Sequence, residues 1–121
     1  MAISVLIIDD EIETCRMLST ALEMFGFSPQ IALSGAEALG MAATHAPQVI
    51  VLDLMMPEMD GFEVARRVRA TPALAAVPII VVTAMGESNA EERALSAGAT
   101  MFMRKPVSIS ALAANIKKLT H

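Results

Sequence analysis

Three aspartates follow two short apolar runs of this 121-residue chain. Asp9 and Asp10 come directly after Ser4–Ile8, and Asp53 comes directly after Val49–Leu52. If these runs are neighbouring parallel strands, their carboxyl ends bring the three carboxylates together. At ~4 Å and an effective dielectric constant of about 20, each like-charged pair costs about 4 kcal/mol, so the cluster needs a cation. Oxygen ligands without His or Cys favour a hard divalent ion, and a small site suits Mg²⁺, with Mn²⁺ as a substitute, better than Ca²⁺.

Polar residues also follow two later apolar runs. Thr83 with Ala84 follows the fourth run, and Lys105 with Pro106 follows the fifth. Parallel strands end at the same sheet edge, so these residues are expected to join the carboxylates. A plainer alternative is that the aspartates only cap a helix or end a strand, and that Lys105-Pro106 is only a strand end. That alternative leaves the polar residues at each of these strand ends unexplained.

Five apolar runs alternate along the chain with five amphipathic segments. Three runs are continuously apolar, which is typical of strands covered by helices on both sheet faces. The alternation predicts an α/β fold with one central parallel five-stranded sheet, a flavodoxin-like (βα)5 three-layer sandwich with strand order 2-1-3-4-5. In that order, ligands bind where strands one and three end. The predicted strands are Ser4–Ile8, Gln30–Leu33, Val49–Leu52, Ile79–Val82 and Thr100–Met103.

Capping signals and helical periodicity occupy the segments between these strands. Ser34, Asp60 and Ser88 each stand three residues before a glutamate, the spacing of a capping box, and Gly98 offers a left-handed helix stop. Two apolar stripes have helical spacing. The stripes are Cys15, Leu18, Leu22 and Phe25, ended by Gly26, and Ile109, Leu112, Ile116 and Leu119, with Lys117 and Lys118 favouring the helix dipole.

The composition excludes several classes of protein. With 55% hydrophobic and 18% charged residues, residues 1–121 are expected to form one globular domain. A net charge of -4 and the lack of Trp and Tyr argue against nucleic acid or a membrane surface as a direct partner. The single cysteine, Cys15, excludes an internal disulfide and is expected in the core. No apolar stretch approaches the ~18 to 20 residues of a membrane span, and no signal peptide is visible, so a cytoplasmic location is expected.

The chain resembles a response-regulator receiver domain, the phosphoacceptor module of two-component signalling. Four segments carry the resemblance in the family's order and spacing, and they span nearly the entire chain: LIIDDE (Leu6–Glu11), VLDLMMPEMDGFE (Val51–Glu63), VVTA (Val81–Ala84) and AGATMFMRKP (Ala97–Pro106). The resemblance implies a signalling switch rather than an enzyme. Its phosphoryl donor would be a histidine kinase or a histidine phosphotransfer protein, and its target a downstream protein or a fused output domain.

The resemblance also implies a role for each member of the acidic cluster. Asp53 would be the nucleophile that takes the phosphoryl group. Asp10 and Asp53 would bind Mg²⁺ directly, and Asp9 would hold it mostly through water. The backbone carbonyl of Met55 would be a further ligand, which any side chain at that position allows.

A second group of residues is implied in phosphoryl binding and in the switch. Lys105 would bind the phosphoryl oxygens, and a cis peptide bond to Pro106 would aim it into the pocket. Thr83 and the loop that begins at Ala84 would move toward the phosphoryl group, and Phe102 would follow Thr83 inward. The surface of the fourth helix, fifth strand and fifth helix would change with them. Ordinary core packing is the alternative for Phe102.

Three positions depart from what some family members carry. Met55 and Met85 stand where polar side chains elsewhere orient the attacking water, and Phe102 lacks the hydroxyl of a tyrosine. We therefore predict slow hydrolysis of an acyl phosphate at Asp53.

Two other functions compete with the switch. A Mg²⁺-dependent phosphohydrolase with an aspartate nucleophile usually needs a second acid two residues later, where this chain has Met55. An FMN-binding electron carrier needs a hydroxyl- and glycine-rich loop after the first strand, where Asp9, Asp10 and Glu11 would repel phosphate.

Three charged or titratable residues are expected outside the site. His45 and His121 fall at predicted helix ends, away from the strand ends that carry the cluster. Arg104 is adjacent to Lys105, so it is expected to point to the opposite side of its strand as a solvated charge. The sequence fits both a single-domain regulator and the receiver part of a longer protein. It favours no particular oligomeric state.

Overall fold

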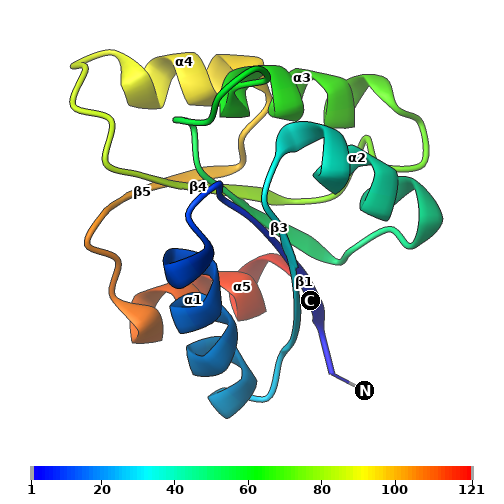
Figure 1. Cartoon of the computed structure of the whole chain (residues 1–121), viewed down its shortest axis with the longest axis vertical. Coiled ribbons are helices and arrows are strands. Elements are labelled where there is room, and N and C mark those ends of the chain that lie inside the picture. The colour runs from blue at the N-terminus through cyan, green and yellow to red at the C-terminus, as the bar shows by residue number, and fades with distance from the viewer. Residues whose placement is uncertain (1, 121) are drawn as a thin grey trace.

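The computed structural model describes residues 2–120 and folds them into five parallel strands that alternate with five helices (Figure 1). The sheet order is β2-β1-β3-β4-β5, which confirms the predicted flavodoxin-like α/β fold. The strands are β1 (Ser4–Ile8), β2 (Ser28–Ala32), β3 (Val49–Leu52), β4 (Ile79–Thr83) and β5 (Met101–Arg104). The helices are α1 (Ile12–Met24), α2 (Gly35–Thr44), α3 (Gly61–Ala70), α4 (Ala90–Ala97) and α5 (Ile109–Leu119).

The sheet separates two hydrophobic cores. Helices α1 and α5 cover one face, and α2, α3 and α4 cover the other (Figure 1). Along β1, Val5 and Ile7 pack toward α1 and α5, whereas Leu6 and Ile8 pack toward the other three helices. Because both faces are covered, the central strands are apolar at successive positions, as the continuous runs predicted.

Three strands differ from their predicted bounds: the central strand β4 extends one residue further, to Thr83, and both edge strands are displaced. Strand β2 starts at Ser28 rather than Gln30 and includes Pro29, and Leu33 lies beyond its end. Pro29 is tolerated because β2 is at the sheet edge, where a missing N–H need not break a ladder. Strand β5 is shifted by one residue, since Thr100 lies before it.

The predicted helix caps are correct at two positions and wrong at one. Ser34 accepts a hydrogen bond from the Glu37 N–H, and Asp60 accepts one from the Glu63 N–H. The Ser88 prediction is wrong, because the N-cap of α4 is Asn89, and its side chain makes no capping bond.

The C-terminal end of α1 differs from the prediction, which placed Phe25 on the apolar stripe of this helix. Phe25 is the C-cap of this helix and is 42% exposed, whereas Phe27, beyond the turn at Gly26, is buried. Gly26 and Gly98 both have positive φ, as expected of left-handed helix stops.

Arg69 joins the elements at the amino ends of β4 and β5. Its guanidinium donates to the carbonyls of Val77 at 2.7 Å, Gly98 at 2.9 Å and Ala75 at 3.2 Å. Burial lowers the pKa of Arg69. This side chain therefore connects the end of α3 to the turn after α4.

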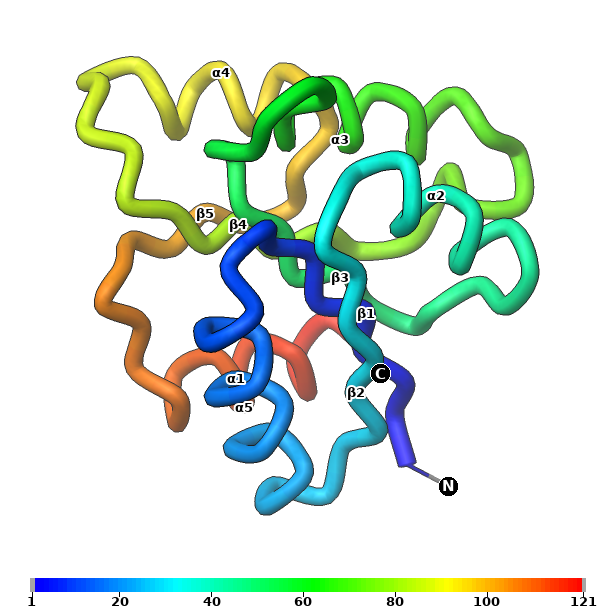
Figure 2. Tube along the Cα trace, in the orientation of Figure 1, coloured from blue at the N-terminus to red at the C-terminus, as the bar shows by residue number. Residues whose placement is uncertain are grey.

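The path of the chain in Figure 2 shows how each of the helices α1 to α4 returns it to the start of the next parallel strand. The loops after β1, β3, β4 and β5 consequently leave the sheet along one edge. Over residues 2–120, no helix has the length and apolar character needed to cross a membrane.

Candidate functional site

The structure brings the three predicted aspartates together at the carboxyl edge of β1 and β3. Asp9 is 3% exposed and Asp53 is 6% exposed, while Asp10 faces solvent. One carboxylate oxygen from each lies within 4.8 Å of the other two. The two neighbouring parallel strands therefore place three like charges in one small volume.

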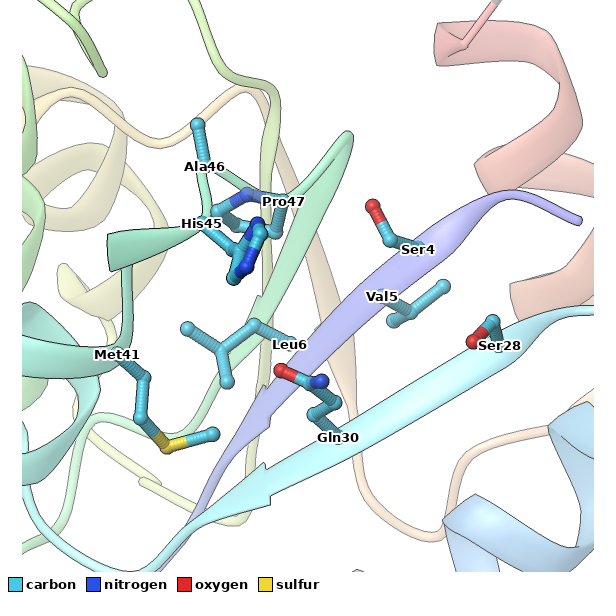
Figure 3. Close-up of a pocket in the computed structure, with 9 residues that line it drawn as sticks. All are labelled: Ser4, Val5, Leu6, Ser28, Gln30, Met41, His45, Ala46 and Pro47. Atoms are coloured by element: carbon cyan, nitrogen blue, oxygen red, sulfur yellow. The ribbon is translucent and has the colours of Figure 1, made fainter. Parts of the chain in front are cut away.

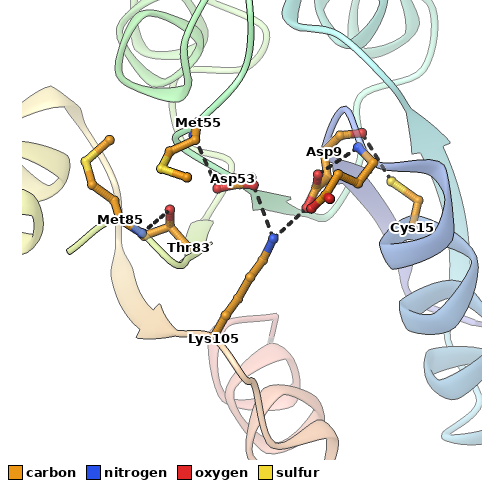
Figure 4. Close-up of polar contacts among 8 residues, drawn as sticks. Asp9, Cys15, Asp53, Met55, Thr83, Met85 and Lys105 are labelled. Carbon is orange, nitrogen blue, oxygen red and sulfur yellow. Dashed lines mark hydrogen bonds and ion pairs between the residues drawn. The ribbon is translucent and has the colours of Figure 1, made fainter.

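Lys105 supplies the positive charge within this cluster. Its Nζ lies 2.9 Å from Oδ2 of Asp9 and 3.2 Å from Oδ2 of Asp53, and Figure 4 shows the ammonium group between the two carboxylates. The peptide bond from Lys105 to Pro106 is cis. A residue 96 positions from Asp9 thus closes the site.

The electrostatics of the site follow from burial and from these contacts. Burial raises the pKa of Asp9, although hydrogen bonds from the Glu11 N–H and from Lys105 oppose the shift. Burial alone would lower the pKa of Lys105, but the bond to Asp9 and the charges of Asp53 and Asp9 outweigh it and raise the pKa. The lysine consequently stays protonated, and the acids hold an excess of negative charge.

Backbone contacts hold the two buried aspartates in place. The Asp53 N–H donates to the Ile8 carbonyl at 2.9 Å, and Oδ1 of Asp53 accepts from the Met55 N–H at 3.3 Å. Oδ1 of Asp9 accepts from the Glu11 N–H at 3.0 Å. The N-cap of α1 is Glu11, so neither Asp9 nor Asp10 caps that helix.

Gly61, the first residue of α3, packs directly on the strand end that carries Asp53. Its N–H donates to the Leu54 carbonyl at 3.0 Å. A Cβ at this position would come within 2.3 Å of the Asp53 carbonyl oxygen. The close approach needs a residue without a side chain.

Cys15 lies beneath Asp9 in the core, as the sequence predicted. It is fully buried, and its Sγ donates to the Asp9 carbonyl oxygen at 3.3 Å (Figure 4). Burial raises the pKa of the Cys15 thiol to about 11. The thiol is therefore neutral and structural rather than nucleophilic.

Thr83 ends β4 beside the acidic cluster and is fully buried. Its Oγ1 accepts a hydrogen bond from the Met85 N–H at 3.2 Å, as drawn in Figure 4. Ala84 is exposed in the loop that follows.

Phe102 is half-buried against the core under α4 and pairs across the sheet with Val81. Met55 is 50% exposed at the rim of the site.

Arg104 is the exposed last residue of β5, and it is more than a solvated charge. Its Nη1 donates to the Met85 carbonyl at 2.7 Å, and its guanidinium carbon lies 5.1 Å from the centre of the Phe102 ring. The contact with Met85 depends on the loop conformation after β4. No periodicity or motif in the sequence signals it.

The donor set fits a hard divalent cation. Three carboxylates offer oxygen ligands within 4.8 Å of one another, and the cluster includes no His or Cys ligand. Small divalent cations such as Mg²⁺ prefer carboxylate oxygens together with water. The exposure of Asp10 leaves one side of the cluster open to solvent.

A separate hollow of about 290 Å³ lies near the opposite end of β1 (Figure 3). It is lined by Ser4, Ser28 and Gln30 and by His45, the exposed C-cap of α2. His45 is therefore away from the carboxyl edge of the sheet, as predicted. His121 lies outside the described residues.

Comparison with known proteins identifies the family. The sequence model of the response regulator receiver domain family matches residues 5–117 of this chain. The response regulator PleD of Caulobacter vibrioides is 34% identical over 120 residues, covering 99% of this chain and 26% of PleD. The response regulator MprA of Mycobacterium tuberculosis is 36% identical over 119 residues, covering 98% of this chain and 51% of MprA. The chain thus spans about a quarter to a half of the length of these relatives.

Solved structures agree with the sequence relatives. The chemotaxis protein CheY4 of Vibrio cholerae superposes with a TM-score of 0.91 at 29% identity, over 98% of this chain and 99% of that chain. The receiver domain of the Francisella response regulator 1452 superposes with a TM-score of 0.89 at 29% identity, over 97% and 95% of the two chains. The chain therefore belongs to the response regulator receiver domains of two-component systems.

Proposed function

We propose that residues 1–121 form a phosphorylation-dependent switch in which Asp53 accepts a phosphoryl group. The observation that supports this most strongly is the group of three carboxylates with one lysine ammonium 2.9 Å and 3.2 Å from two of them. A buried acid beside a positive charge, on an edge open to solvent, suits a covalent acceptor better than a structural ion pair.

The net negative charge of the site explains why phosphorylation needs a divalent cation and additional hydrogen-bond donors. Three carboxylates and one ammonium give a net charge of -2. A divalent cation brings the total to zero. An acyl phosphate replaces the single charge of Asp53 with about two negative charges, so the loaded site lacks one positive unit. Additional hydrogen-bond donors must then turn toward the phosphoryl group.

The transfer itself needs little beyond positioning. An oxygen of Asp53 attacks the phosphorus of a phosphohistidine on the donor. The new O–P bond forms while the P–N bond breaks, and its electron pair stays on the imidazole nitrogen of the donor. Lys105 stabilises the charge on the phosphoryl oxygens, and the Thr83 hydroxyl donates to one of them.

Asp10 and Asp53, with the Met55 carbonyl and a water-mediated contact to Asp9, would hold Mg²⁺. When bound, the ion supplies positive charge that screens the acids and the incoming phosphoryl oxygens. The donor would be a histidine kinase or a histidine phosphotransfer protein.

The change of surface would start at the loop after β4. When Thr83 and the amides from Ala84 onward move toward the phosphoryl group, Phe102 would turn inward and alter the face formed by α4, β5 and α5. A downstream target or a fused output domain would then bind this face differently.

Phosphorylation with acetyl phosphate tests the proposal. In Mg²⁺, wild-type protein should gain one phosphoryl group, detected by intact-mass spectrometry, and Asp53→Asn should gain none. Glu23→Gln, which changes an exposed acid at the end of α1 by the same charge, should be labelled like wild type.

Two results would contradict the proposal. One is labelling of Asp53→Asn to the wild-type level. The other is continuous hydrolysis of phosphate esters without accumulation of the adduct, which would favour the phosphohydrolase instead. Loss of Mg²⁺-dependent amide shifts in Asp10→Asn would independently support the metal site.

A further inference from the structure

An arginine from β5 holds the loop that follows β4. Nη1 of Arg104 donates to the carbonyl oxygen of Met85 at 2.7 Å. The same guanidinium lies over the ring of Phe102, with 5.1 Å between its central carbon and the ring centre. Charged donors make stronger hydrogen bonds than neutral ones, so this contact restrains the backbone of the loop.

The restrained loop residue is also the partner of Thr83. The Met85 N–H donates to Oγ1 of Thr83, while the Met85 carbonyl accepts from Arg104. Thr83 and Arg104 are directly paired across β4 and β5. One loop residue therefore connects the threonine beside the acidic cluster to the arginine on the outer strand.

A second arginine contacts the loop, but through side chains alone. Nη1 of Arg93 lies 2.9 Å from a carboxylate oxygen of Glu87, and the two side chains are 46% and 57% exposed. Such exposed pairs contribute little, because water and salt screen them and both side chains lose freedom. Arg104 is also exposed, but it differs because it donates to a main-chain carbonyl of the loop and lies over the Phe102 ring.

We propose that Arg104 is a positioning residue that holds the loop in its unphosphorylated conformation and thereby weakens phosphoryl binding. This inference rests on the proposed function. Loading the site requires Thr83 and the loop amides to move toward Asp53 and requires Phe102 to turn inward. The Met85 carbonyl and the Phe102 ring would then both leave the guanidinium. Contacts made only in the unloaded state oppose loading by their full free energy.

The variant Arg104→Met tests this role with beryllofluoride as the phosphoryl analogue. Methionine keeps an aliphatic stem over Phe102 but has neither charge nor donor. At saturating Mg²⁺, titration calorimetry should show beryllofluoride binding about fivefold tighter than to wild type, which corresponds to about 1 kcal/mol. Arg104→Lys keeps a charged donor and should fall between the two.

A spectroscopic readout separates positioning from a merely structural role. Without beryllofluoride, the backbone amide signals of residues 84–89 in Arg104→Met should shift toward their positions in the loaded wild-type protein. Lys118→Met removes the same charge from an exposed site on α5 and should leave both the affinity and these signals unchanged.

The outcomes distinguish this inference from the function on which it rests. If wild type binds beryllofluoride and Arg104→Met binds it equally or more weakly, the positioning role is wrong and the proposed function stands. Failure of wild type and Lys118→Met to bind beryllofluoride in Mg²⁺ would overturn the proposed function, and the inference with it.

Discussion

A methyl group added at Gly61 would collide with the main chain of the residue that carries the site. The Cβ of Gly61→Ala would come within 2.3 Å of the Asp53 carbonyl oxygen and 2.7 Å of the Leu54 Cα. Ordinary contact begins at about 3.4 Å, so one side must move by about 1 Å. Both groups that the Cβ would meet are main-chain atoms, which cannot rotate away as a side chain could. The Asp53 N–H is also hydrogen-bonded to the Ile8 carbonyl of the neighbouring strand.

We therefore expect Gly61→Ala to lower the free energy of unfolding by about 3 kcal/mol. For a domain of this size that corresponds to a fall of about 10 °C in Tm. The matched control is Gly40→Ala within α2, where an added Cβ meets nothing within 4 Å. There alanine should stabilise the helix by about 1 kcal/mol, so the same substitution should have opposite signs at the two positions.

Circular dichroism is the appropriate probe because the chain contains neither Trp nor Tyr. Thermal and urea unfolding would be followed for both variants, and Mg²⁺ titration by amide NMR would report whether Asp53 has been displaced. Wild-type stability together with wild-type Mg²⁺ affinity in Gly61→Ala would refute the argument that α3 is packed tightly against the end of β3.

Other substitutions test the electrostatics, the chemistry and the packing of the domain. Because burial raises the pKa of Asp9 above its unfolded value, this group binds more protons in the folded state, and its contribution to stability should fall as pH rises from 4 through the folded pKa. Urea unfolding without Mg²⁺ should therefore show Asp9→Asn gaining stability relative to wild type over that range; a constant difference would contradict this. Met55→Asn should speed loss of radiolabelled phosphate from Asp53, because an amide can orient the attacking water that methionine cannot, whereas an unchanged rate would count against slow hydrolysis. Arg69→Met should lower the free energy of unfolding by about 2 kcal/mol, because three carbonyls lose a charged donor, yet leave Mg²⁺ affinity at the wild-type value.

The fold was predictable where burial is strongest. Strands β1 and β3 begin and end at the predicted residues, since a strand covered on both faces is apolar throughout. The edge strands are less completely buried, so their ends do not coincide with the ends of their apolar runs. The prediction that Ser88 caps α4 was wrong because capping-box spacing does not determine at which residue of a loop the helix begins.

The site was predictable to the extent that topology determines it. Parallel strands end together, so acids after β1 and β3 converge even though 43 positions separate Asp10 from Asp53. The bond from Arg104 to the Met85 carbonyl was not predictable in this way. It depends on the course of an irregular loop, which neither residue type nor spacing specifies.

Helix α4 buries smaller side chains than α3 does. It has eight residues, and those it buries are Ala90, Ala94 and Ala97, each with a single methyl group. At about 0.8 kcal/mol per buried carbon, sliding such a surface disturbs little packing compared with α3, which buries Phe62 and two valines. The alanine side chains of α4 are too short to interdigitate deeply with the residues beneath them, so they do not fix the position of the helix along its axis. Reorienting α4 would therefore disturb less packing than reorienting α3.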